Sequence, residues 1–369
     1  MSESLPLSAL MSRALVAFTI ELDNTWESRM PHRTTRFGGP RGAPYAVSLA
    51  RWSNFMRAVP EEGVPVAELE RRVRARLPID GMRRWRYVTI APDPDCGRDR
   101  VPQRDWLITP TTVGLQAQSV WRELPAEIER RWADRFGVDA VAGIRANLEE
   151  VVRALTLADL PQWITGHYGG YAGQNLEFNR QAPAAGADEW PLPLLALLCQ
   201  SLQAFAVEYE ADSDAPLSYS ANVLRLLDEG GIRVAELPCR SGVAVEPLRV
   251  ALKILIQRRF IAVGSNRGGG RLKIARLTGR GLAGQALYRE RPAELEADWC
   301  RRVGDAPLRH LRAGLEAIVT AGHGGREARR APVWQGLEPP PGTWRSRVPI
   351  PEVLPDFPMP RQSGHPDGA

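Results

Sequence analysis

A repeat within the chain constrains its fold more than any other sequence feature. Residues 5–21 return as residues 192–208 without a gap, so that Phe18 corresponds to Phe205 and Glu21 to Glu208. Two further similarities follow in the same order, 66–69 with 234–237 and 123–132 with 290–299. Three matched segments in one order indicate a duplicated domain, and units of this length are not the short repeats of a solenoid. We therefore expect two similar domains that form a pseudo-dimer within one chain.

The overall composition is that of a globular protein of two ordinary domains. Of 369 residues, 44% are hydrophobic and 25% are charged. The four cysteines are far apart, which argues against a zinc site or a disulfide framework and fits a reducing compartment. The first residues lack the features of a signal peptide, and no apolar run reaches the roughly 18 residues of a membrane helix. The prediction is a cytoplasmic protein with no membrane segment, no metal and no other cofactor.

The charge balance mildly favours an acidic partner such as nucleic acid. The formal net charge is +5, and Lys253 and Lys273 are the only lysines among 48 basic residues. Arginine suits bidentate contacts to phosphate and guanine. A GC-rich genome explains the general preference for arginine more simply, so this observation decides little alone.

The chain divides into four segments. The first repeat covers 5–152, a connector rich in glycine and proline covers 153–191, the second repeat covers 192–321, and a Pro/Gly-rich tail covers 322–369. In the first repeat the pattern predicts helices at 5–23, 49–58, 66–75, 113–135 and 138–155, and a hairpin from 85–90 and 105–108. The tail is expected to be disordered or wrapped over the surface, because such a composition cannot bury a core of its own.

The second repeat contains a helix-turn-helix pattern. A helix at 220–227 and a short helix at 234–242, closed by Gly242, precede an amphipathic helix at 246–259. On this last helix, one set of residues is expected to face the core: Leu248, Leu252, Leu255 and Ile256. Another set is expected to point outward: Arg249, Lys253 and Arg258. Such a helix can enter a DNA major groove.

A basic hairpin follows the helix-turn-helix pattern. Alternating strands at 260–263 and 272–275 flank a glycine-rich tip that carries Arg267 and Arg271. Glycines allow a hairpin tip to approach a backbone closely, and these arginines could enter a minor groove or hold phosphates. Thr278 is placed to cap the helix that comes next.

These elements resemble the MarR family of winged-helix transcriptional regulators. The specific part is the hairpin followed by the segment Leu277-Thr278-Gly279-Arg280-Gly281, and the likeness extends over both repeats. The resemblance implies a mainly α fold with small β-wings: tandem winged helix-turn-helix domains that share a helical pseudo-dimer interface. It implies that helices 5–23, 113–155, 192–210 and 281–319 build that interface. Family members are usually homodimers, so this tandem chain is expected to act as a monomeric pseudo-dimer or as a homodimer.

The first repeat departs further from the family pattern. Its recognition helix is compressed into 78–85, where Gly81 costs about 1 kcal/mol in a helix. The region is nevertheless basic, and we hypothesise that the first repeat holds the DNA backbone while the second reads bases. The residues expected to contact DNA are Arg249, Lys253, Arg258, Arg267, Arg271 and Lys273 in the second repeat and Arg76, Arg83, Arg84, Arg98 and Arg100 in the first. The alternative for each is an ordinary solvated surface.

Tryptophans in the first repeat suggest a small-molecule effector. Trp26, Trp52 and Trp121 lie where the family often binds ligands, and aromatic side chains commonly line such pockets. Core packing explains the same residues and is the preferred interpretation.

The sequence predicts a function in double-stranded DNA binding rather than catalysis. None of the five histidines has a metal-ligand spacing or a convincing Ser or Cys partner, so no catalytic residue is assigned. The predicted protein is a bacterial transcriptional regulator that recognises unequal half-sites. The alternatives are a winged-helix adaptor that binds protein and a small-molecule-responsive sensor.

Overall fold

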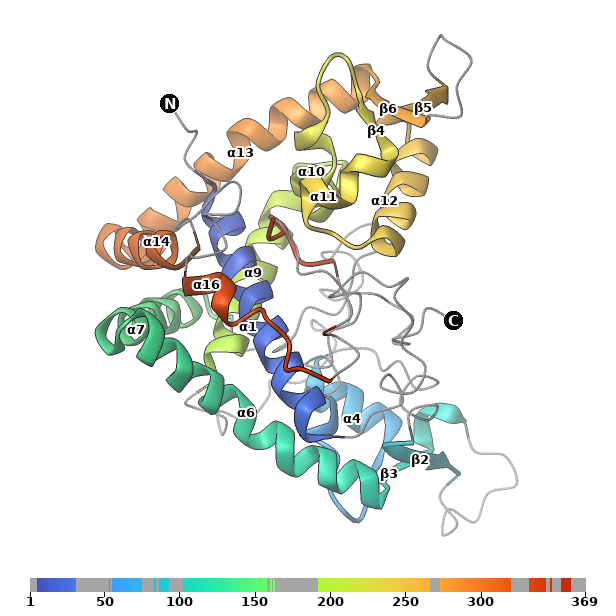
Figure 1. Cartoon of the computed structure of the whole chain (residues 1–369), viewed down its shortest axis with the longest axis vertical. Coiled ribbons are helices and arrows are strands. Elements are labelled where there is room, and N and C mark those ends of the chain that lie inside the picture. The colour runs from blue at the N-terminus through green and yellow to red at the C-terminus, as the bar shows by residue number, and fades with distance from the viewer. Residues whose placement is uncertain are drawn as a thin grey trace.

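The protein is mainly helical. The computed structural model describes residues 5–30, 53, 55–74, 83, 86–92, 102–157, 160, 162, 192–265, 273–319, 332–342, 346 and 353–359. Within these residues the helices are accompanied by two small antiparallel sheets, each of three strands. The expectation of a mainly helical chain with small sheets is therefore confirmed (Figure 1).

The first half of the chain begins with a long helix and ends with two more. Its elements are α1 (Leu7–Arg29), β1 (Val64–Pro65), α4 (Val66–Val73), β2 (Val88–Ala91), a 3-10 turn (Gln103–Asp105), β3 (Leu107–Pro110), α6 (Thr112–Phe136) and α7 (Val138–Ala154). The strands form a sheet in the order β1-β3-β2, with β3 in the centre.

The second half repeats this arrangement. Its elements are α9 (Leu194–Glu210), α10 (Leu217–Asn222), 3-10 turns (Leu224–Leu226 and Val234–Glu236), β4 (Ile232–Arg233), α11 (Leu237–Ser241), α12 (Val245–Gln257), β5 (Ile261–Ser265), β6 (Lys273–Leu277), α13 (Gly279–Val303) and α14 (Asp305–Val319). The sheet order β4-β6-β5 corresponds to that of the first half. A short helix, α16 (Pro332–Gln335), lies beyond both halves.

The long helix after each sheet begins in the same way. The Thr111 hydroxyl accepts a hydrogen bond from the Gly114 N–H at 3.0 Å, and the Thr278 hydroxyl accepts one from the Gly281 N–H at 3.1 Å. Each threonine therefore caps a helix, since it satisfies an N–H of the first turn. The predicted cap at Thr278 is confirmed, and the first half contains the same device.

The two halves share one hydrophobic core. In Figure 1, α1 and α9 run through the middle of the molecule, while α7 and α14 meet at one side. Helix α1 contacts α6, α9 and α14, and helix α7 contacts α6, α9 and α14. Because apolar residues of all these helices belong to one buried cluster, each half completes the core of the other. A second, smaller cluster lies around α12 and its sheet.

A pair of equivalent arginines ties the halves together. Arg145 on α7 donates a hydrogen bond to the Leu192 carbonyl of the second half at 2.7 Å. Arg312 on α14 donates one to the Leu5 carbonyl of the first half, also at 2.7 Å. An interface in which each side makes the same contact to the other is the pattern of a two-fold dimer.

The segments that revealed the repeat also make equivalent contacts. The Trp132 Nε1–H donates to Glu21 Oε2 at 3.2 Å, and the Trp299 Nε1–H donates to Glu208 Oε2 at 2.8 Å. Both tryptophans are fully buried. In each repeat the glutamate thus accepts a hydrogen bond from the buried indole N–H, which explains why the two residues recur together.

The tail beyond residue 322 is partly packed into the molecule. Val333, Leu337, Leu354 and Phe357 are all buried, and the Leu337 carbonyl accepts a hydrogen bond from Asn24 Nδ2 at 3.1 Å. Of the two alternatives expected for the tail, disorder or wrapping over the surface, the second describes 332–342 and 353–359. These segments need no core of their own, because their apolar side chains cover surfaces left open by the two repeats.

Candidate nucleic-acid interface

Helix α12 is the main candidate for a DNA-contacting element. Gly242 ends α11 in the left-handed conformation, at φ 71°, and allows the chain to turn into α12 three residues later. Leu248, Leu252 and Leu255 are buried, as predicted, in the cluster beneath the helix. One side of α12 is therefore fixed, and the other is available to a partner.

The available side of α12 carries two cationic side chains. Arg249 and Lys253 are exposed, and Arg258, directly after the helix, is exposed as well. Their predicted outward orientation is confirmed. The guanidinium of Arg258 donates to the Asp214 carbonyl at 3.3 Å, so this residue also contacts the loop between α9 and α10.

One residue of this helix was misplaced by the sequence pattern. Ile256 was expected to face the core, yet it is 44% exposed. Positions 249, 253 and 256 are separated by four and three residues and so share a helix face. Val245, 47% exposed, extends the same face at its beginning. The exposed face is thus cationic in the middle and apolar at both ends.

A β-hairpin lies beside α12 and contributes another cation. Ser265 at the end of β5 is in register with Lys273 at the start of β6, so Lys273 lies at the tip end of the described hairpin. Lys273 is exposed. Arg267 and Arg271, the other predicted contacts of this hairpin, lie outside the described residues. The described structure therefore places Arg249, Lys253, Arg258 and Lys273 on one small domain, which consists of α10, α11, α12 and the sheet β4-β6-β5.

The corresponding region of the first half is less complete. Of the predicted contacts, Arg83 is described and exposed. The others, Arg76, Arg84, Arg98 and Arg100, lie outside the described residues. The exposed side of α4 carries Arg71 and Arg72, but both bind Glu68, with Arg71 Nε at 2.9 Å from Oε2 and Arg72 Nε at 2.8 Å from Oε1.

The ion pairs on α4 reduce the positive charge of this helix. Hydrogen bonds from Arg71 and then Arg72 lower the pKa of the Glu68 carboxyl below its usual value. Glu68 is therefore ionised at neutral pH and offsets one of the two guanidinium charges. Because DNA affinity depends on the number of phosphates neutralised, α4 offers a weaker electrostatic contact than its residues alone suggest.

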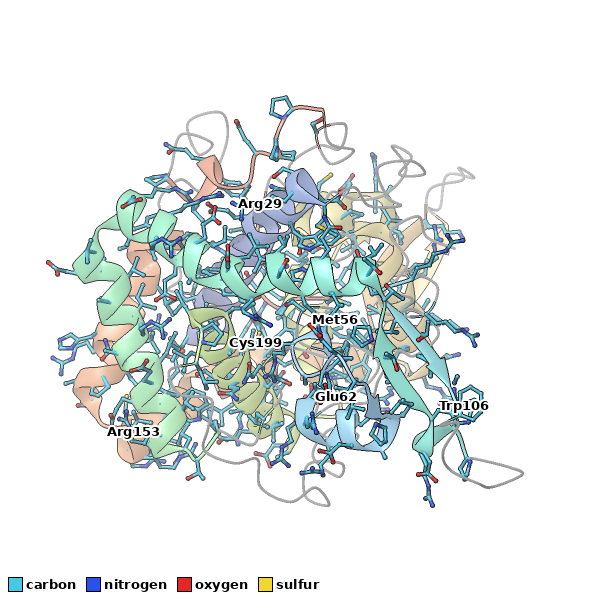
Figure 2. All side chains as sticks on the ribbon, turned by 90° about the horizontal axis from the view of Figure 1, so that it is seen from below. Arg29, Met56, Glu62, Trp106, Arg153 and Cys199 are labelled. Carbon is cyan, nitrogen blue, oxygen red and sulfur yellow. The ribbon has the colours of Figure 1, made fainter. Side chains whose placement is uncertain are left out.

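A glutamine on α6 and one on α13 each hold a small domain in place. In the first half this small domain consists of α4 and the sheet β1-β3-β2. Gln118 Nε2 on α6 donates to the carbonyls of Met56 at 2.6 Å and Val59 at 2.7 Å. Gln285 Nε2 on α13 donates to the Leu224 carbonyl at 2.7 Å, and to a second carbonyl of the same turn. In Figure 2, Met56 lies beneath the long ribbon of α6. The two domains are thus attached to the shared helices in an equivalent manner.

The tryptophans predicted as ligand contacts are part of the core. Trp26 and Trp121 stack with ring centroids 5.2 Å apart and planes inclined by 13°. Tyr87 packs edge-on against Trp121 at 5.4 Å, and burial raises the pKa of its hydroxyl well above the usual value. Trp52 lies outside the described residues. The stacking accounts for both described tryptophans as packing residues.

The described part of the chain holds neither a metal cluster nor a membrane span. No three or more His, Cys, Asp or Glu side chains lie close enough there to hold a metal ion. Among the described helices, none combines the length and apolar character that a membrane span requires.

Comparison with known proteins does not supply a family. No family model, curated protein or solved structure matches this chain. A function for this chain must therefore be inferred from the residues and contacts described above.

Proposed function

We propose that this protein binds double-stranded DNA with sequence specificity and acts as a bacterial transcriptional regulator. In this proposal the repeats 5–152 and 192–321 are tandem winged helix-turn-helix domains of the MarR type. Helix α12 is the recognition helix of the second domain, and the hairpin β5–β6 is its wing. The shared helices form the pseudo-dimer interface.

The observation that carries the proposal is the exposed cationic face of α12. A left-handed turn at Gly242 sets this helix off from α11, its other face is buried, and Lys273 lies on the adjacent hairpin. A helix presented in this way fits a major groove, and a basic hairpin beside it fits the flanking backbone. In Figure 1 the two small domains lie at the two ends of the molecule, on the side away from α7 and α14.

The pseudo-dimer suggests a binding site with two unequal parts. Two recognition helices of a dimer engage major grooves about 34 Å apart. The halves of this chain carry different residues, and the exposed arginines of α4 are paired with Glu68. We therefore propose that the second half reads bases and supplies most of the affinity, while the first half adds weaker contacts to the backbone.

The contacts that each half makes to the other through Arg145 and Arg312 support a monomer as the functional unit. Arg145 and Arg312 each bind the opposite half of the same chain, so the two-fold arrangement is complete without a second copy. The protein is expected to elute at the mass of a monomer in size-exclusion chromatography coupled to light scattering. A dimer at low micromolar concentration would contradict this part of the proposal.

Selection from a random duplex library, at two salt concentrations, tests the proposed function. The expected result is an asymmetric two-part motif whose affinity falls steeply with salt, because phosphate contacts release counterions. Replacing Arg249 and Lys253 by alanine is expected to weaken binding to that motif by roughly 1–3 kcal/mol for each base that the side chain reads. A matched control is Arg153→Ala, which removes one exposed positive charge at the end of α7, far from Trp106 and the first sheet in Figure 2.

Two outcomes would count against the proposal. Salt-sensitive binding without a motif would indicate a general DNA-binding protein. Equal loss of affinity in the Arg249→Ala and Arg153→Ala variants would show that α12 is not the reading element.

One observation favours a second candidate function, that of an adaptor that binds a protein. The exposed face of α12 includes Val245 and Ile256, 47% and 44% exposed, and apolar side chains are typical of protein interfaces. The same two residues could instead contact thymine methyl groups. An interaction with a protein that is insensitive to salt, together with no DNA binding at low salt, would favour the adaptor.

A further inference from the structure

The segment 353–359 lies between the shared helical core and the small domain of the second half. Phe357 is fully buried in the large core that contains α1 and α9. Met359, two residues further on, is 7% exposed and belongs to the separate core around α12. The segment therefore contributes to both hydrophobic clusters, as α10 does with Leu217 in the large one and Tyr219 in the smaller one.

A buried carboxylate anchors the segment to both sides. Asp356 is 1% exposed, and its Oδ1 lies 2.8 Å from Arg13 Nη2 on α1. Its Oδ2 lies 2.8 Å from Arg225 Nη2 in the turn after α10. The Ser12 hydroxyl adds a hydrogen bond to the Pro355 carbonyl at 2.8 Å. The Arg13 Nε–H donates a hydrogen bond to Oδ1 at 2.9 Å, so the contact to α1 is directional, whereas Arg225 and Oδ2 form an ion pair.

The same segment touches the small domain at two further places. Asn222 Nδ2 donates to the Phe357 carbonyl at 2.7 Å, and the Phe357 N–H donates to Asn222 Oδ1 at 3.3 Å. A methyl group added at Gly242 would lie 2.1 Å from the Val353 carbonyl oxygen. The segment is therefore packed directly against the turn from which α12 starts.

This segment makes the two halves unequal. It occurs once, after both repeats, so the duplication itself supplies no second copy of it. It ties the domain of the second half to α1, which belongs to the first half. The orientation of α12 is thereby fixed relative to α1, a helix of the first repeat.

We propose that 353–359 is a positioning element that fixes the orientation of α12 relative to the shared core, with Asp356 as its main positioning residue. When the element is released, the small domain of the second half samples other orientations. The consequence for DNA rests on the proposed function. If only a fraction of molecules presents α12 correctly, the apparent affinity for a two-part site falls by that fraction.

A distance measurement tests the orientation without DNA. Spin labels are placed on Cys239, exposed on α11, and on Glu62→Cys, in a chain with Cys96 and Cys300 replaced by serine. We expect a narrow distance distribution in the parent protein and a broader one after Asp356→Ala.

Two further variants sharpen this measurement. Asn222→Ala, which removes the contacts to Phe357 but leaves Asp356 intact, should broaden the distribution as well. Glu338→Gln is the matched control, because it removes an exposed carboxylate of the same C-terminal region, and it should leave the distribution unchanged. An unchanged distribution in both Asp356→Ala and Asn222→Ala would overturn the proposal.

DNA binding provides the second measurement. With a DNA duplex that carries both parts of the selected motif, Asp356→Ala is expected to weaken binding about tenfold. The Glu338→Gln variant is expected to bind as the parent protein does. A broader distance distribution with unaltered DNA affinity would overturn the role in recognition. If the parent protein binds no DNA, the proposed function fails, and the distance measurement still decides the positioning role.

Discussion

Arg145 and Arg312, each of which binds a carbonyl of the opposite half, allow a quantitative test of the shared core. We consider Arg312→Gln, in which the side chain becomes shorter and loses its charge. The Arg312 guanidinium binds the carboxylates of Glu296 and Glu316 and the Leu5 carbonyl, and its side chain is 26% exposed. Burial tends to lower the pKa of this guanidinium, but the glutamates outweigh burial and raise it. Its charged form is therefore favoured in the folded protein.

The expected destabilisation follows from these interactions. A hydrogen bond involving a charged group contributes about 1.5–3 kcal/mol. Glutamine retains an amide NH2 that can donate hydrogen bonds, and water reaches a side chain that is one-quarter exposed, so we expect the free energy of unfolding to fall by about 2 kcal/mol. Arg145→Gln should cost a similar amount, since Arg145 binds Glu129, Glu149 and the Leu192 carbonyl in the equivalent way.

Equilibrium unfolding in urea, followed by tryptophan fluorescence, measures both effects. The midpoint should move to lower urea in each variant with little change in slope, because the native fold is retained. Arg153→Gln is the control, since the exposed pair of Arg153 and Glu150 should contribute less than about 0.5 kcal/mol. If Arg312→Gln is no more destabilising than this control, or if only one of the two equivalent arginines matters, the idea of a symmetric interface is refuted.

Two further predictions concern glycine packing and cysteine reactivity. Gly281→Ala should lower the thermal midpoint, because the added methyl group would lie 2.0 Å from a backbone carbonyl oxygen just before β5, at a cost of about 3 kcal/mol. Gly279→Ala has open space and should leave the midpoint unchanged or slightly higher; equal effects in a thermal scan would refute this difference in packing. Burial, followed by Asp305, raises the pKa of the Cys300 thiol, whereas Cys239 is exposed. At pH 8 a disulfide reagent should therefore modify Cys239 about ten times faster in single-cysteine variants, and equal rates would contradict this.

The long helices could be predicted from the sequence because their apolar periodicity is strong. The predicted helices 113–135 and 138–155 correspond closely to α6 and α7, and 246–259 corresponds to α12. The hairpin of the second half was also predicted, with strands that begin one residue later than expected. In each case local pattern and tertiary packing favour the same structure.

Short elements that depend on distant partners were missed. The strands β1 and β4 contain two residues each and exist because they pair with β3 and β6, far along the chain. The predicted helix 220–227 is instead α10, which ends at Asn222, followed by a 3-10 turn. A two-residue strand has no periodicity to detect, so only the fold reveals it.

The candidate site was predicted in part. The outward orientation of Arg249 and Lys253 follows from helical spacing, and the structure confirms it. The exposure of Ile256 was not predicted, because its hydrophobicity alone suggested the core. The ion pairs of Glu68 with Arg71 and Arg72 could have been recognised from their spacing of three and four residues. The repeat of Thr111 and Gly114 in the later Thr278 and Gly281 was a further signal in the sequence.

The burial of α1 along nearly its whole length has a consequence for the synthesis of this chain. Almost every residue of α1 is buried, including polar ones, although α1 leaves the ribosome well before the later helices that cover it. Its partners include α14 and Asp356, which lies 343 positions beyond Arg13. Because the ribosome adds about 5–20 residues per second, tens of seconds pass between the synthesis of α1 and that of these partners. Helix α1 thus lacks these native partners while the 343 positions from Arg13 to Asp356 are synthesised, so its native packing is completed late.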